Sequence, residues 1–385
     1  MPVETLIAPT PITAASVPQQ QRYHSFDSLR AAMMFLGIWM HGVQCYTCLE
    51  VYMWPFKDTA RSQVFDFTIN WVHMFRMPVF FAMAGFFFAL LTARRGLATT
   101  LANRAKRILL PFLLGWAVLA PILVATITYL RNWSWPTALA AATTGATYWK
   151  AGPLHLWFLE YLLLFYPVML GIDWLVQGML GSRALHAVSR LFRWILRSRG
   201  RALFMALVTV GPQATMGGWL TTPTAFEPDP RIFITYLLFF SFGWALYFAR
   251  DTLEEIKRGG GMEMLLGVGL TVLGYGVLLD VVPGRVWLFA GPLETWLFIF
   301  GFTSLFLRYL DRPIAWVRYL ADSSYWLYLL HVPVLIWIQV LIAPLPLPAL
   351  LKGLLALVIA MPLLLASYHL LVRHTWIGTL LNGRR

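Results

Sequence analysis

Long apolar runs, separated by short polar segments, follow one another along almost the whole chain. Most of these runs hold roughly 20 residues, the length that an α-helix needs to cross the hydrocarbon core of a bilayer. Backbone groups in lipid must be hydrogen-bonded within the protein, so such runs form helices. The pattern therefore predicts about ten transmembrane helices, at residues 29–53, 65–92, 107–130, 154–178, 202–222, 231–249, 262–282, 286–307, 321–343 and 349–372.

The composition agrees with this pattern. Hydrophobic residues make up 59% of the 385 positions and charged residues 12%, whereas soluble domains carry about 25% charged residues. The first segment is polar and lacks the basic start and apolar core of a signal peptide. We interpret residues 1–21 as a disordered cytoplasmic tail, residues 22–378 as a single transmembrane domain, and residues 379–385 as a short cytoplasmic tail.

The basic residues are divided unequally between the two sides that ten spans define. Of the 30 Lys and Arg residues, 22 fall on the side of the termini, seven fall on the opposite side, and Arg76 lies within a span. Cytoplasmic loops carry an excess of Lys and Arg, so both termini are expected in the cytoplasm. No tract combines basic and aromatic residues as a nucleic-acid site does. The net charge of +13 thus needs no nucleic acid as a partner.

The two cysteines, Cys45 and Cys48, form one C-x-x-C pair and exclude a disulfide framework. If the first span is helical throughout, both lie on the same face as His41, so a metal site is an alternative. A closed zinc site needs four ligands, and small buried cysteines are common in protein cores. We therefore favour a packing role and expect no bound metal.

Arg30 and His41 lie in the first span, 11 residues apart. In a helix this spacing corresponds to three turns, about 16 Å along the axis, and nearly the same face. Arg30 then lies at the membrane surface and His41 near the middle of the bilayer. An ionisable group at that depth is costly and is a candidate functional group.

Other ionisable residues are predicted at middle or outer-middle depth, namely His73 and Arg76 in the second span, Glu160 in the fourth and His331 in the ninth. Each could be a polar contact between helices. For the set we favour a shared, water-accessible cavity, because charged side chains inside membranes usually face such cavities or one another.

Several basic residues gather at the predicted cytoplasmic mouth of this cavity. Positive charge on that side alone explains Arg94 and Arg95, but planar guanidinium groups also bind phosphates well. An anionic cofactor with a long arm, such as coenzyme A, would reach from the mouth to His41. A histidine with a pKa near neutrality can act there as general base toward a hydroxyl. The residues concerned are Arg30, Arg104, Lys106 and Arg107.

Four motifs, in chain order, resemble the membrane acyltransferases of family 3. The family has a basic residue, ten intervening positions and a histidine in its first helix, as do Arg30 and His41. The other three are an aromatic segment with Pro and Gly at residues 75–86, an Arg-x-x-Arg at Arg104 and Arg107, and a Ser-Tyr-x-x-Tyr-Leu-x-His segment at Ser324, Tyr325, Tyr328, Leu329 and His331.

This resemblance implies an all-α polytopic protein of the bacterial inner membrane that carries out O-acyl transfer. The implied co-substrate is acyl-CoA, with succinyl-CoA favoured, and no cofactor is tightly bound. The implied acceptor is a hydroxyl of a periplasmic glucan. Membrane lipids and other proteins of glucan biosynthesis are the further expected partners. O-acetylation of another cell-surface glycan, and a proton-coupled transporter or flippase, are the alternatives.

The resemblance and the predicted depths together give each candidate residue a role. His41 is the expected general base, Arg30 a partner for the donor or for an acidic group, and Arg76 the group that polarises the acyl carbonyl or holds a succinyl carboxylate. Arg104 and Arg107 are expected to bind the phosphates of coenzyme A. Contacts with the substrate are expected from His331, Glu160, His73 and Tyr328.

Overall fold

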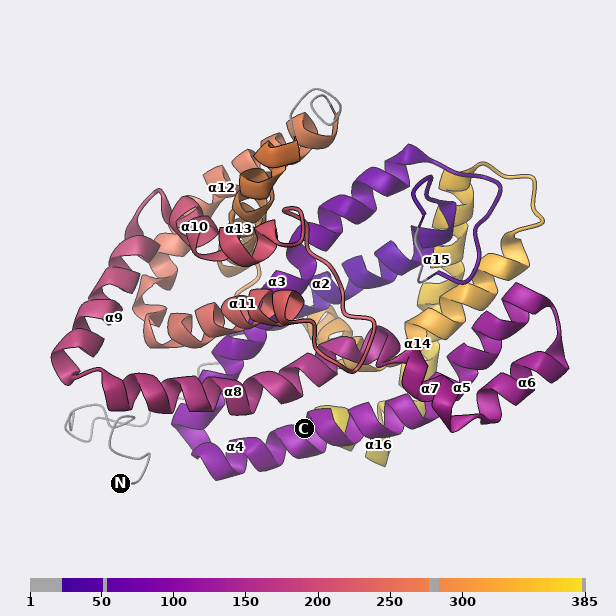
Figure 1. Cartoon of the computed structure of the whole chain (residues 1–385), viewed down its shortest axis with the longest axis horizontal. Helices are drawn as coiled ribbons and strands as arrows, with labels where there is room; N and C mark the ends of the chain where they lie inside the picture. The colour runs from indigo at the N-terminus through magenta and orange to yellow at the C-terminus, as the bar shows by residue number, and fades with distance from the viewer. Residues whose placement is uncertain (1–22, 51–53, 277–283, 383–385) are drawn as a thin grey trace.

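The computed structural model describes residues 23–50, 54–276 and 284–382. Within these ranges the chain consists of α-helices and short helical turns joined by loops, without a β-strand (Figure 1). The predicted tail at residues 1–21 lies outside the described residues. Residues 379–382 of the second predicted tail belong to helix α16 (Trp376–Asn382).

Each of the ten predicted spans overlaps a described helix, although several of the bounds differ. Their bounds are α2 (His24–Val43), α3 (Gln63–Arg95), α5 (Leu110–Asn132), α8 (Trp157–Met179), α10 (Arg201–Ala214), α11 (Pro230–Phe248), α12 (Leu253–Gly276), α13 (Gly284–Tyr309), α14 (Ala315–Ile342) and α15 (Ala349–Ser367). Among the described residues, 7 helical segments are long and apolar enough to cross a membrane. They include all of these helices except α2, α10 and α12.

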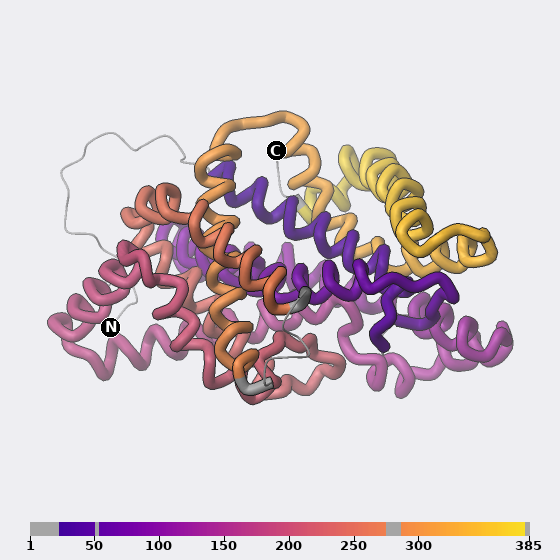
Figure 2. Tube along the Cα trace, turned by 90° about the horizontal axis from the view of Figure 1, so that it is seen from above, coloured from indigo at the N-terminus to yellow at the C-terminus, as the bar shows by residue number. Residues whose placement is uncertain are grey.

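Shorter elements connect these helices. Helix α4 (Leu97–Arg104) continues through a π-helical turn (Ala105–Leu109) into α5, while α6 (Trp135–Thr143) and α7 (Gly145–Ala151) follow α5. Helix α9 (Ser182–Arg197) lies at one end of the molecule, and α15 and α6 lie at the other (Figures 1 and 2). Helices α2 and α3 pass between these two ends, so residues of both can contact helices from distant parts of the chain.

Helix α3 packs directly against α11 through two glycines. A Cβ added at Gly85 would collide with the carbonyl of Phe240, and one added at Gly243 would collide with that of Ala82. Small residues at helix contacts in membranes allow such close approach of two backbones. The α3–α11 pair therefore forms a fixed wall from which the polar residues of α3 project.

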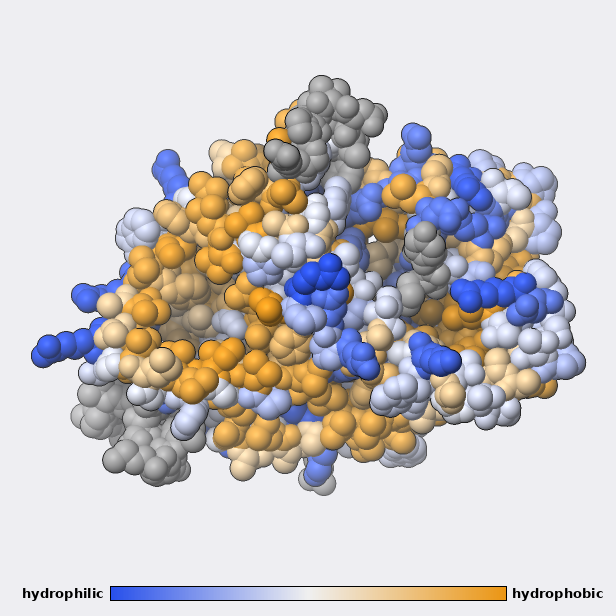
Figure 3. Space-filling view, viewed as in Figure 1, coloured by the Kyte–Doolittle hydropathy of each residue, from blue (hydrophilic) through white to orange (hydrophobic). Residues whose placement is uncertain are grey.

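The surface of the bundle carries large apolar side chains where it would face lipid. Leu113, Leu114 and Val118 are exposed on α5, and Leu354 and Val358 on α15. In Figure 3, orange residues also cover much of the face formed by α8 to α13. This distribution is typical of a multi-pass membrane protein, whose outer surface is solvated by hydrocarbon.

The first predicted span, residues 29–53, is too long. Helix α2 ends at Val43, and a short 3₁₀ turn (Gln44–Tyr46) leads the chain away. The Gln339 amide of α14 donates hydrogen bonds to the carbonyls of His41 and Gly42, at 2.9 and 3.0 Å. A side chain from a distant helix thus satisfies carbonyls that a helix end leaves free.

The sequence pattern suggested that both cysteines share one face of the first helix with His41. This prediction is wrong, because α2 ends before either cysteine. Cys45 is buried in the 3₁₀ turn and Cys48 is exposed in the loop that follows. In the described part of the chain, no three His, Cys, Asp or Glu residues are grouped so as to hold a metal ion.

The loop between α2 and α3 is fixed to α15 by a buried ion pair. Lys352 Nζ lies 2.9 Å from each carboxylate oxygen of Asp58 and 2.7 Å from the carbonyl of Ala343. Both charged side chains are almost completely buried. Because a buried charge is costly without its partner, this pair holds the loop in one position beside the end of α2.

Candidate active site

A cavity of about 710 Å³ is lined by α2, α3, α5, α7, the start of α8 and α14, with residues from the connecting loops. Its walls combine apolar side chains with histidine, arginine and threonine. Five of the nine site residues predicted from sequence line this cavity, namely His41, His73, Arg76, Tyr328 and His331. Three separate helices, α2, α3 and α14, therefore contribute predicted residues to one space.

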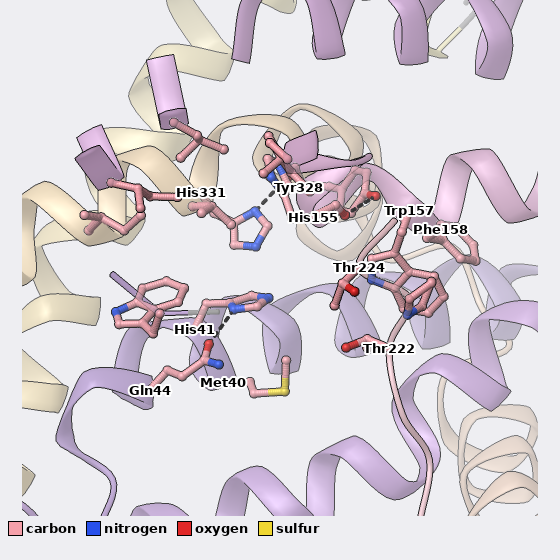
Figure 4. A pocket seen from close by; sticks show the side chains of 18 of the residues that line it. Met40, His41, Gln44, His155, Trp157, Phe158, Thr222, Thr224, Tyr328 and His331 are labelled. Atoms are coloured by element: carbon pink, nitrogen blue, oxygen red, sulfur yellow. Dashed lines mark hydrogen bonds between the residues drawn. The ribbon is translucent and has the colours of Figure 1, made fainter. Parts of the chain in front are cut away.

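His41 is in the last turn of α2, and its ring is oriented by the residue that begins the 3₁₀ turn. Its Nδ1 lies 2.9 Å from Oε1 of Gln44 (Figure 4). An amide oxygen only accepts hydrogen bonds, so Nδ1 carries the proton and donates it. The other ring nitrogen, Nε2, then has a free lone pair, as a general base requires.

A second glutamine, Gln339 of α14, holds the surroundings of His41 in place. Besides holding the end of α2, Gln339 accepts a hydrogen bond from the indole nitrogen of Trp54 at 2.8 Å. The Trp54 ring stacks on the imidazole of His41, with ring centres 5.5 Å apart. Gln339 is fully buried. One side chain of α14 thus fixes both the backbone that carries His41 and the aromatic ring that covers it.

Two further histidines adjoin His41. The ring centre of His331 lies 5.2 Å from that of His41 and 5.5 Å from that of His155 (Figure 4). Nδ1 of His331 donates to the carbonyl of Tyr328 at 2.8 Å, and Nε2 of His155 donates to the carbonyl of Leu329 at 3.0 Å. Backbone acceptors therefore orient both rings, and His155 joins the 3₁₀ turn before α8 (Leu154–Leu156) to α14.

Arg76 brings a positive charge to the same cavity. The residue is 8% exposed, and its guanidinium packs against Gly37, one turn before His41 on α2. Among the described residues, its Nε has no hydrogen-bond partner and no carboxylate forms an ion pair with it. Since an uncompensated buried charge is costly, this guanidinium is suited to an anion that enters the cavity.

His73 lies on α3, almost one turn before Arg76. Its Nε2 donates to the carbonyl of Leu220 at 2.6 Å, so this ring also joins α3 to the loop after α10. His73 therefore combines a place on the cavity wall with a hydrogen bond that stabilises the fold.

Four predicted site residues lie outside the lining of the cavity. Arg30 is partly exposed and pairs with Asp27 at 3.6 Å, but it shares the continuous helix α2 with His41. Arg104 is the last residue of α4, and Arg107 lies in the middle of the π-helical turn. Glu160 is buried on α8, and its Oε2 has no hydrogen-bond partner among the described residues.

One face of α14 connects the π-helical turn with the cavity. The Tyr325 hydroxyl donates to the carbonyl of Arg107 at 2.9 Å, and the Tyr328 hydroxyl donates to that of His155 at 2.7 Å. Tyr325, Tyr328 and His331 are spaced by three residues, so they follow one another along this face. Polar side chains thus extend from the basic region around Arg107 to His41.

Sequence reasoning missed four residues of the site: Gln44, Trp54, His155 and Gln339. Gln339 could have been found as a polar residue inside an apolar span. The predicted span 154–178 puts His155 at its very end, but a turn with Gly152 and Leu154 at positive φ directs it inward. Gln44 and Trp54 follow from how the chain leaves α2, for which the sequence carries no comparable signal.

A family model described as "Acyltransferase domain", that of acyltransferase family 3, matches residues 23–369. The chain belongs to acyltransferase family 3. Glucans biosynthesis protein C of Salmonella paratyphi B is 26% identical to it over 96% of this chain and 97% of the relative. The proteins of the same name from Salmonella schwarzengrund and Salmonella dublin give the same identity and coverage. No solved structure matches the chain.

The resemblance inferred from four motifs is thereby confirmed. As a member of acyltransferase family 3, the protein is an enzyme that transfers acyl groups. Its family match spans α2 to α15 and includes all the residues that line the cavity. The chemistry of the cavity can therefore be considered as that of an acyl-transfer site.

Proposed function

We propose that this protein transfers an acyl group, with succinyl favoured, from acyl-CoA to hydroxyls of a glucan. The acceptor class is supported by the name of its relatives, glucans biosynthesis protein C. We further propose a bacterial inner membrane location with both termini in the cytoplasm, supported by the excess of Lys and Arg on that side. The donor then enters from the cytoplasm and the acceptor from the periplasm.

The proposed reaction begins with proton transfer from an acceptor hydroxyl to Nε2 of His41. The sugar oxygen attacks the acyl carbonyl of the thioester and forms a tetrahedral intermediate. The guanidinium of Arg76 stabilises the negative charge that develops on the carbonyl oxygen. Collapse of the intermediate breaks the carbon–sulfur bond, and the imidazolium returns its proton to the departing thiolate. Acyl glucan and free CoA are the products.

One observation carries this proposal. A histidine whose Nδ1–H is held by Gln44 at 2.9 Å lines the same cavity as Arg76, a buried arginine without a described carboxylate partner. The first arrangement provides a base and the second provides a site for developing negative charge. These are the two groups that acyl transfer to a hydroxyl requires.

The donor is proposed to bind along α2 and the face of α14. Arg104 and Arg107 would bind phosphates of coenzyme A, with Arg30 beside them, and the pantetheine arm would reach inward toward His41. The rise of α2 from Arg30 to His41, about 16 Å, suits an arm of that kind. His331, His73 and Tyr328 would contact the substrates within the cavity, and Glu160 is assigned a structural role.

The test uses purified protein with radiolabelled succinyl-CoA or acetyl-CoA, each with and without glucan. We expect label in the glucan and one CoA released per acyl group, with succinyl-CoA the better donor. Preference for acetyl-CoA would replace the proposed donor but retain the reaction class. Absence of CoA release and of labelled glucan with both donors would overturn the proposal. Transport of label across liposomes without transfer would favour a transporter instead.

A further inference from the structure

The cavity is lined by positive charge at both its inner and its outer parts. Among the described residues that line it, Arg76, Arg131 and Lys150 are basic and none is Asp or Glu. Arg76 is buried, whereas Arg131 and Lys150 are exposed to solvent. The latter two therefore mark the mouth of the cavity, away from the basic residues of the π-helical turn.

Arg131 and Lys150 have no acidic partner among the described residues, unlike two other basic residues on the side opposite the termini. Arg231 pairs with Asp229 at 2.6 Å, and Lys352 pairs with Asp58. No described carboxylate forms an ion pair with Arg131 or Lys150, and neither side chain donates to a described acceptor. Their hydrogen-bonding capacity is available to a ligand at the mouth.

Threonine hydroxyls line the same cavity as the two cations. Thr128 precedes Arg131 by one turn on α5, and Thr147 precedes Lys150 on α7; both line the cavity. Thr222 and Thr224 line it as well, from the loop after α10 (Figure 4). Hydroxyls that donate and accept, together with cations, suit a ligand that carries both sugar hydroxyls and an anionic group.

The turn that positions Lys150 is held firmly. Gly152 has φ +67°, and a Cβ at this position would collide with the carbonyl of Thr224. The indole nitrogen of Trp116 donates to the carbonyl of Gly152 at 3.0 Å. The end of α7 is thereby fixed against both α5 and the threonine loop, so Lys150 has a defined place at the mouth.

Basic residues are few on the side of the molecule where Arg131 and Lys150 are predicted to lie. Charge counting places only seven Lys and Arg residues on the side of the molecule opposite the termini, and two of them line the mouth of the cavity. The excess of basic residues on cytoplasmic loops therefore does not account for Arg131 and Lys150.

We propose that Arg131 and Lys150 form an anion-binding subsite for the acceptor. The subsite takes a carboxylate or phosphate group that the glucan already carries, while a free hydroxyl of the same glucan reaches His41. This inference rests on the proposed function for the identity of the acceptor. If the transferred group is succinyl, each transfer adds a carboxylate, so a partly acylated glucan becomes a better ligand than the neutral glucan.

The test measures binding separately from turnover. Fluorescently labelled neutral glucan and the same glucan carrying succinyl groups are titrated against the full chain in nanodiscs of phosphatidylcholine. We expect the anionic glucan to bind more tightly, with a preference that weakens as salt increases. Exposed ion pairs contribute little binding free energy, so R131Q and K150Q should each weaken binding of the anionic glucan only about two- to fivefold. The double variant should abolish the preference for the anionic glucan.

Arg231→Gln is the matched control. It removes the same charge at the start of α11 and preserves the hydrogen bond from the backbone of residue 231 to Asp229. Equal binding of the two glucans by the wild type, or an equal loss in R231Q, would overturn the subsite. A preference that disappears in nanodiscs of anionic lipid would assign the cations to lipid headgroups and overturn it too. Failure of acyl transfer with the binding preference intact would instead overturn the proposed function alone.

Discussion

Gln44→Met tests whether the hydrogen bond from His41 to Gln44 holds the imidazole in the tautomer and orientation that a general base needs. Methionine nearly preserves the side-chain volume but removes the amide oxygen that accepts from Nδ1 at 2.9 Å. A hydrogen bond contributes about 0.5–1.5 kcal/mol, which corresponds to a roughly 2- to 13-fold loss of the correct tautomer and orientation. Loss of a general base itself costs about 10²- to 10⁴-fold. The variant should therefore lower kcat moderately.

The assay is steady-state CoA release with saturating donor and acceptor. We expect a lower kcat, within that range, and unchanged KM values, because Gln44 acts through His41. Gln213→Met is the control: Gln213 is fully buried on α10, and neither atom of its amide has a hydrogen-bond partner among the described residues. The reasoning is refuted if Q44M retains wild-type kcat, or if its loss equals that of a variant lacking the His41 imidazole.

Three further changes test other parts of the structure. Gly37→Ala places a methyl group where the Arg76 guanidinium packs. The displaced guanidinium should lower kcat, as its removal in Arg76→Met should also do, and wild-type turnover of G37A would contradict this. Lys352→Met leaves the buried Asp58 uncompensated and should lower stability by about 3–5 kcal/mol, seen as a lower thermal midpoint in detergent; an unchanged midpoint would contradict it. Arg104→Gln should raise the KM for acyl-CoA in a salt-dependent manner, and a lower kcat with unchanged KM would assign Arg104 a structural role.

The helical architecture could be predicted because lipid imposes a strong constraint on the sequence. Every run of about 20 apolar residues must form a helix to satisfy its backbone, and each predicted span overlaps one. The end of the first helix could not be predicted in this way. It depends on Gln339, nearly 300 positions away, which caps α2 through two carbonyls.

Part of the candidate site could be predicted from the sequence for a related reason. Depth along a helix follows from residue counting, and this brought together His41, His73, Arg76 and His331 as residues of one region. The direction of a side chain does not follow from depth. Glu160 is two positions after Phe158, hence about 200° around α8 from it; Phe158 lines the cavity and Glu160 does not.

Loop residues were missed because their position is set by tertiary contacts. Trp54 stacks on His41 only because its loop returns over the end of α2, where Gln339 and the Lys352–Asp58 pair hold it. The pattern of apolar residues does not predict that this loop folds back over the end of α2. The parts of the site that depend on helix depth were thus predictable, and those that depend on loop packing were not.

Comparison of His41→Ala with the wild type tests the central claim most directly. Both proteins are incubated with radiolabelled succinyl-CoA and glucan, and labelled glucan is measured, with binding of succinyl-CoA followed in parallel. His186→Ala, which removes an exposed histidine of α9, is the control. We predict that H41A transfers label about 10²- to 10⁴-fold more slowly while it binds succinyl-CoA normally. Transfer by H41A at the wild-type rate would contradict the account.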